Sequence, residues 1–142
     1  QSLTAALAGV WGSPAFWLNN IYYSAKKDYI KEFRVYQDLL STSPIAQSAN
    51  SLGYPGSIPS VSANGATNGI LWLIDSSAFG DGRPDILYAF DAANVSRELY
   101  DSTQAGTRDQ AGPAVKYNPP TVANGKVYLG TNGEVDVYGL LP

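Results

Sequence analysis

The final stretch of the chain, Pro119–Leu141, most narrowly limits how the chain can fold. It contains three short runs of strand-forming residues, and the dipeptides Asn124-Gly125 and Asn132-Gly133 separate them. An Asn-Gly dipeptide between two such runs is typical of a tight hairpin turn, because both residues tolerate positive φ angles. The stretch therefore predicts a small antiparallel meander of three strands.

The same arrangement occurs twice more, upstream. A proline precedes the first run of each unit (Pro14, Pro59 and Pro120), and a turn containing asparagine follows. The first two prolines are about 45 residues apart, a spacing typical of propeller blades. The third follows after a longer interval, which indicates an insertion within 76–84 or 101–112. The sequence thus predicts an all-β fold of about three four-stranded antiparallel units, at approximately 11–42, 57–101 and 113–142.

Three segments are less regular. Residues 29–35 read as a strand, with a helix over residues 29–40 as the alternative because Ile30, Phe33 and Gln37 have helical spacing. Residues 42–56 are rich in Ser, Asn, Gly and Pro and are expected to form a loop. Residues 1–10 are small and apolar, and we expect them to supply a strand to a neighbouring unit.

The composition excludes several classes of function. Cysteine is absent, which excludes disulfides, thiolate metal sites and cysteine nucleophiles. Histidine is absent too, which removes the Ser-His-Asp triad and the commonest zinc ligand. A net charge of −3 without a basic cluster argues against nucleic-acid binding, and no apolar run approaches the ~20 residues of a membrane helix. Since the chain begins at Gln1 and has no methionine, we expect it to derive from a longer one.

Two loop carboxylates form a candidate calcium site. Asp81 and Asp85 lie in the glycine-containing run Asp81-Gly82-Arg83-Pro84-Asp85, and carboxylate oxygens are ligands that Ca²⁺ prefers. The run lacks the ligand spacing and the distal glutamate of an EF-hand. A solvated turn is therefore the alternative interpretation.

Two other loops carry candidate ligand-binding residues. Tyr54 lies in Tyr54-Pro55-Gly56, where the sequence gives little reason for burial, so it is the aromatic residue most suited to ligand contact. The other aromatic residues are expected to pack between units. Arg108 and Asp109 can form a small polar site, or else an ion pair that fixes their loop.

The repeats resemble a known family. Pro120–Thr131 (PTVANGKVYLGT) and Leu87–Ala92 (LYAFDA) are similar to blades of pyrroloquinoline-quinone-like, or quinoprotein-type, β-propellers. The resemblance implies that the chain corresponds to the C-terminal three blades of such a propeller. Quinoprotein dehydrogenases of this family bring a vicinal cysteine pair, a Ca²⁺ site and a catalytic aspartate. This chain has no cysteine and we match no other pocket residue, so we expect no cofactor. Binding of Ca²⁺ or of the quinone would be implied by the resemblance alone.

These observations favour a non-catalytic binding or assembly module over an enzyme. An open arc of three blades would leave apolar flanks in water, so we expect a protein partner: the remaining blades of a larger propeller, or further copies of the chain. The alternatives are a fragment of a quinoprotein-like oxidoreductase and a structural subunit that assembles through blade edges. The resemblance and the composition predict an extracellular or periplasmic location.

Overall fold

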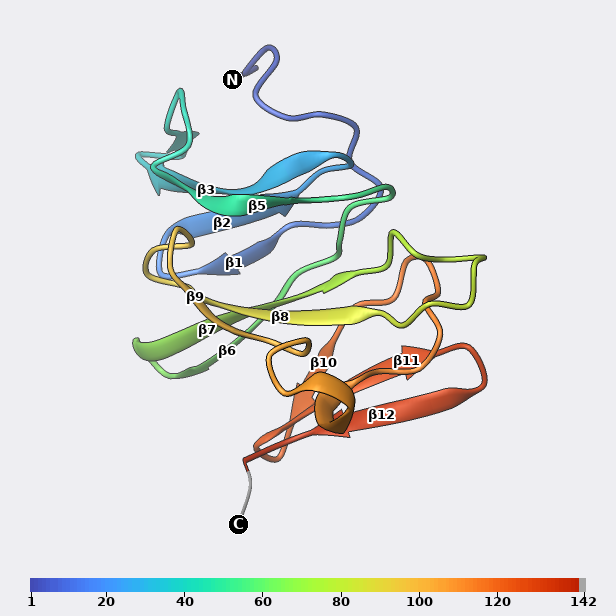
Figure 1. Ribbon diagram of the computed structural model, residues 1–142. Coiled ribbons are helices and arrows are strands. Elements are labelled where there is room, and N and C mark those ends of the chain that lie inside the picture. The colour runs from blue at the N-terminus through green and yellow to red at the C-terminus, as the bar shows by residue number, and fades with distance from the viewer. Residues whose placement is uncertain (141–142) are drawn as a thin grey trace.

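The fold is all-β, as the sequence predicts. A computed structural model describes residues 1–140 and shows three antiparallel sheets and one short 3₁₀ turn, η1 (Gly106–Asp109) (Figure 1). Sheet I comprises β1 (Ala15–Trp17), β2 (Asn20–Ser24), β3 (Asp28–Tyr36), β4 (Leu39–Leu40) and β5 (Ala46–Leu52). Sheet II comprises β6 (Ser60–Asn64), β7 (Thr67–Asp75), β8 (Ile86–Asp91) and β9 (Glu98–Asp101). Sheet III comprises β10 (Thr121–Ala123), β11 (Lys126–Thr131) and β12 (Glu134–Tyr138).

The first strand of every sheet begins directly after the proline that marks its repeat. β1, β6 and β10 start at Ala15, Ser60 and Thr121. β6 lies next to both β1 and β10. The indole Nε1 of Trp17 donates to the Gly65 carbonyl at 3.0 Å. On the other side, the Ser60 hydroxyl donates to the Pro120 carbonyl at 2.6 Å. The first strands of the three repeats therefore stand side by side.

The turns of sheet III follow from their residues. Ala123 pairs with Lys126, so Asn124 and Gly125 alone close the first hairpin. Their φ angles of +52° and +72° match the turn type whose twist suits antiparallel strands. In the second hairpin Thr131 pairs with Glu134 across Asn132-Gly133. The predicted meander is confirmed.

Sheet II lies between the other two sheets (Figure 1). A separate apolar core fills each of the two junctions. Strands β2, β3, β7 and β8 supply most of the core between sheets I and II, with Tyr22, Ile30, Leu71, Leu73 and Phe90 fully or almost fully buried. The core between sheets II and III contains Ile74, Leu87, Ala111, Val127 and Leu129. Within the strands of each sheet, apolar side chains at alternate positions point toward the neighbouring sheet. This is how a strand with one buried face packs.

Two expectations about sheet I are wrong. Residues 42–56 contain strand β5, which pairs with β3, and are not a simple loop. Small polar side chains make this strand look like a loop, but the Ser48 hydroxyl accepts the Ile30 backbone N–H at 2.9 Å and donates to the Asn50 carbonyl at 2.7 Å. Pairing with β3 therefore outweighs local propensity. The strand predicted over residues 29–35 is confirmed as part of β3, so the helical alternative over residues 29–40 is also wrong.

The segment 1–10, here called the N-terminal strap, forms no strand. It crosses the outer face of sheet I as irregular backbone. The Gln1 side chain both donates to and accepts from the Leu40 backbone, and the Ala8 N–H donates to the Asp28 carboxylate at 3.2 Å. Side-chain hydrogen bonds and isolated backbone hydrogen bonds hold this segment against sheet I. No ladder of backbone hydrogen bonds forms, so the expected strand is absent.

The outer face of sheet III has no such cover within residues 1–140. Strand register places Tyr128 opposite Val137 and Gly130 opposite Val135. The side chains of Tyr128, Val135 and Val137 therefore share the face turned away from sheet II. Val135 is 65% exposed and Val137 51%. Leu141 and Pro142, the end of the third predicted unit, lie outside the described residues.

Candidate functional site

Tyr54 stands in a cluster of aromatic side chains where the segments before β1 and β10 meet the β5–β6 and β7–β8 connections. Its ring meets Trp11 edge to face, with centroids 5.8 Å apart, and Phe79 in a tilted arrangement at the same distance. The hydroxyls of Tyr54 and Tyr117 lie 3.4 Å apart. The Lys116 ammonium lies 4.2 Å from the centre of the Phe79 ring. We call these five residues the aromatic cluster.

Four separate segments supply the aromatic cluster. Trp11 precedes β1, Tyr54 lies between β5 and β6, Phe79 lies between β7 and β8, and the last two members precede β10. Tyr54 is half-buried by its neighbours rather than free in a loop. The structure therefore places Tyr54 among aromatic residues from all parts of the chain, a neighbourhood that no local pattern in the sequence indicates.

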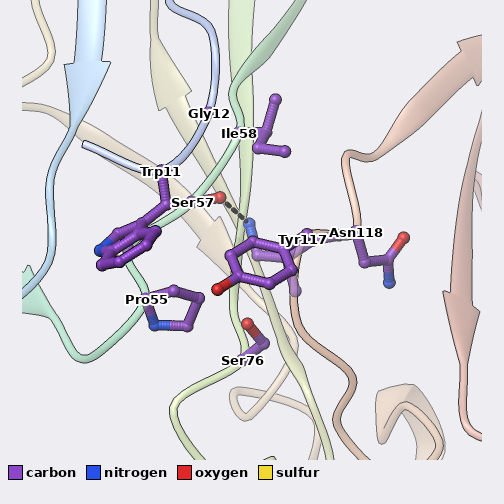
Figure 2. A pocket seen from close by; sticks show the side chains of 10 residues that line it. Trp11, Gly12, Pro55, Ser57, Ile58, Ser76, Tyr117 and Asn118 are labelled. Atoms are coloured by element: carbon purple, nitrogen blue, oxygen red, sulfur yellow. Dashed lines mark hydrogen bonds between the residues drawn. The ribbon is translucent and has the colours of Figure 1, made fainter.

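A shallow hollow adjoins the aromatic cluster. Figure 2 shows the rings of Trp11 and Tyr117 standing on either side of Pro55 at its mouth. Its floor is closed by a hydrogen bond in which the Ile74 backbone N–H donates to the Ser57 hydroxyl at 2.9 Å. The enclosed space is about the size of one water molecule. Any organic ligand would therefore rest on the exposed rings rather than enter the hollow.

Gly56 fixes the shape of this site. Its φ angle is +88°, in the region that favours glycine. A Cβ added here would come within 2.7 Å of the Ser24 carbonyl oxygen, which cannot move without disturbing sheet I. The glycine thus lets the Tyr54–Ile58 segment pass close against the end of β2 and turn Tyr54 toward the other rings.

The two candidate calcium ligands lie in different environments. Asp81 is exposed, and Arg83 donates to its carboxylate at 2.8 Å. Asp85 is only 1% exposed, and neither of its carboxylate oxygens makes a hydrogen bond of normal geometry. Residues 1–140 contain no group of three or more acidic side chains suited to hold a metal ion.

Burial gives Asp85 an unusual protonation equilibrium. Desolvation raises the pKa of its carboxyl to about 7, although the Val115 backbone N–H and the Asn118 amide oppose the rise. The nearby carboxylates of Asp75 and Asp136 raise the pKa further. Asp85 therefore exchanges its proton near neutral pH at the junction of sheets II and III.

Arg108 and Asp109 do contact each other, on η1. The guanidinium donates to both carboxylate oxygens, with Nε–Oδ1 2.6 Å and Nη2–Oδ2 2.8 Å. These bonds, together with one from the Tyr100 hydroxyl, lower the pKa of Asp109 to about 2. The Tyr138 hydroxyl donates to the Asp109 carbonyl at 3.0 Å. The pair thus joins η1 to β9 and β12, as the loop-fixing interpretation expects.

Sequence reasoning missed one buried acid, Glu32. It is fully buried, and its carboxylate accepts the Asn20 amide at 2.5 Å and the Val95 backbone N–H at 3.2 Å. Burial raises the pKa of Glu32, while the bond from Val95 opposes the rise. A glutamate within a strand gives no local signal of burial. Its partner Val95 belongs to sheet II's β8–β9 turn, so the contact depends on how the sheets stack.

Comparison with known proteins identifies no relative. No family model matches the chain, no curated protein matches it, and no solved structure matches it. No helix within residues 1–140 is long and apolar enough to cross a membrane.

Proposed function

We propose that this chain is a non-catalytic assembly module, built of three propeller-type blades, that binds protein through the outer face of sheet III. The observation that carries the proposal is the exposure of Val135 and Val137 beside Tyr128 on that face. On the other face of the same sheet, Val127 and Leu129 are buried against sheet II. A sheet that is apolar on both faces is typical of one with a neighbour on each side.

The partner that best fits this face is another β-sheet. Sheets I and II, and sheets II and III, already pack face to face through alternating apolar residues. The first strands β1, β6 and β10 stand side by side, and in a propeller each blade contacts the blades on both of its sides. The additional sheet would belong to a further blade of a larger propeller or to a second copy of the chain. An extracellular or periplasmic location forms part of the proposal and rests on the family resemblance and the composition.

Sedimentation velocity tests the proposal. We expect the 15.1-kDa chain to form larger species as its concentration rises, because self-association is the available way to cover the face. The double variant Val135→Lys, Val137→Lys should sediment as a monomer, since two ammonium groups would have to be desolvated on docking.

The matched control places the same charges elsewhere. Leu39 and Ile45 are exposed to a similar extent, at 53% and 47%, but Leu39 is on β4 and Ile45 directly precedes β5, so both lie at sheet I. The variant Leu39→Lys, Ile45→Lys should associate like the unaltered chain. A stable, well-dispersed monomer at every concentration of the unaltered chain would contradict the proposal, and so would equal loss of association in both variants.

A further inference from the structure

Three rings of the aromatic cluster surround a positive charge. The Lys116 ammonium lies 4.2 Å from the centre of the Phe79 ring and 5.9 Å from the centres of the Tyr54 and Tyr117 rings. All three distances fall within the ~6 Å over which a ring face attracts a cation. Together the rings form a cage whose occupant in this structure is a lysine of the same chain.

Aromatic rings, rather than a carboxylate, provide the attraction in this cage. Within residues 1–140 the ion pairs involve Lys31, Arg83, Arg97 and Arg108, and Lys116 makes none. Ring faces favour weakly hydrated organic cations, since these lose little hydration on contact, and quaternary ammonium groups are the usual ligands of such cages. The chemistry of the cage therefore selects a methylated ammonium over a hydrated metal ion.

The occupant can leave the cage. Lys116 is exposed and is attached through a flexible four-carbon chain, whereas Phe79 and Tyr54 are half-buried and held by neighbouring rings. The exposed ring of Trp11, which meets Tyr54 edge to face, extends the surface beside the cage, where the remainder of a ligand can lie. We propose that Tyr54, Phe79 and Tyr117 form a binding site for a trimethylammonium group, with Lys116 as its intramolecular competitor.

The test is an NMR titration of the whole chain that follows the amide resonances of the three cage residues. The probes are choline and Nε-trimethyl-lysine, which distinguish a small alcohol or lipid headgroup from a modified side chain as the source of the group. The uncharged choline isostere 3,3-dimethylbutan-1-ol is the control for simple apolar contact. We expect saturable shifts with at least one charged probe at concentrations up to about 100 mM, and none with the isostere.

Variants separate the cage from its competitor. Lys116→Met keeps an unbranched, flexible side chain but removes its charge, so it should tighten binding roughly two- to five-fold. Lys126→Met removes an exposed lysine of sheet III and should leave the affinity unchanged. Phe79→Leu removes the ring nearest the ammonium and should abolish the response. Absence of saturable shifts in both the unaltered chain and Lys116→Met would overturn the inference, and so would equal binding of the isostere.

Discussion

The outer faces of sheets I and III, at the two ends of the stack, differ in whether their apolar side chains are covered. On the outer face of sheet I, Phe33 is 1% exposed, because the N-terminal strap lies over it. On the outer face of sheet III, Val135 is 65% exposed and nothing within residues 1–140 lies over it. Both faces carry apolar side chains in strand alternation. The pattern of a strand therefore shows which side chains can be buried, but not whether a cover is present.

The strap also shows that a sheet face can be covered without a further strand. Leu3, Leu7, Tyr23 and Phe33 line a space of about 250 Å³ between the strap and sheet I. The Lys26 N–H donates to the Gly9 carbonyl at 2.9 Å, which ties the strap to the β2–β3 turn. The cover is therefore loosely packed but anchored, and the contrast with sheet III can be tested by mutation.

The largest difference between the two ends should come from truncating one apolar side chain on each. Phe33→Ala removes a ring buried between the strap and sheet I, and should lower the free energy of unfolding by about 3–5 kcal/mol. Val137→Ala, on the bare face, should change it by about 0.5 kcal/mol or less. Urea unfolding of both variants at low protein concentration measures the difference. Equal losses would show that the two faces do not differ in cover.

The next effect concerns Asp85, the buried acid at the junction of sheets II and III. The folded-state pKa of Asp85 is about 7, above the value of an exposed aspartate, so folding favours its protonated form. Its contribution to stability is fully present below pH ~4 and is lost as the pH rises through about 7. Asp85→Asn should therefore raise the free energy of unfolding by about 2 kcal/mol at pH 8.

The control for this prediction is the same unfolding measurement at acidic pH. At pH 4 the advantage of Asp85→Asn should disappear, because the unaltered carboxyl is then protonated in the folded state. Denaturant unfolding across this range gives the result directly. A variant less stable than the unaltered chain at pH 8 would mean that the Asp85 carboxylate is well satisfied in the folded protein.

A matched pair of tyrosines compares the two junctions on a smaller scale. The Tyr22 hydroxyl donates to the Ala92 carbonyl at 2.5 Å between sheets I and II, and the Tyr138 hydroxyl donates to the Asp109 carbonyl at 3.0 Å beside sheet III. Tyr22→Phe should cost about 1–1.5 kcal/mol because the bond is buried, and Tyr138→Phe about 0.5 kcal/mol because its bond is partly open to water. Thermal unfolding can rank them, and the reverse order would show that sheet III is the more tightly joined.

The last expected effect concerns the N-terminal strap. Although burial alone would raise the pKa of Asp28, hydrogen bonds from Lys31 and from the backbone of Ala8 and Tyr29 lower it. Since the folded-state pKa is depressed, this stabilisation is present above pH ~4 and is lost as the pH falls through the folded-state value. Asp28→Asn should cost about 1 kcal/mol at pH 7 and less at pH 3. Faster proteolysis within residues 1–10 would confirm that the loss is local.

Sequence patterns predicted the three sheets because their signals are local. A proline before each first strand and an asparagine turn after it act within a few residues. Strand β5 was missed because its register depends on β3, and the strap because irregular backbone has no periodicity. Of the aromatic cluster, the sequence indicated only Tyr54 as a ligand-binding residue. Trp11, Phe79 and Lys116 lie on separate segments that meet Tyr54 only when the sheets stack.

Hydrogen–deuterium exchange at low and high protein concentration tests most directly whether the outer face of sheet III is the docking face. We expect peptides covering β11 and β12 to exchange more slowly at high concentration, and peptides covering β2 and β3 under the strap to exchange at an unchanged rate. The same slowing should be absent from Val135→Lys, Val137→Lys. Slowing confined to sheet I, or no change anywhere at concentrations where the chain has associated, would contradict docking through the outer face of sheet III.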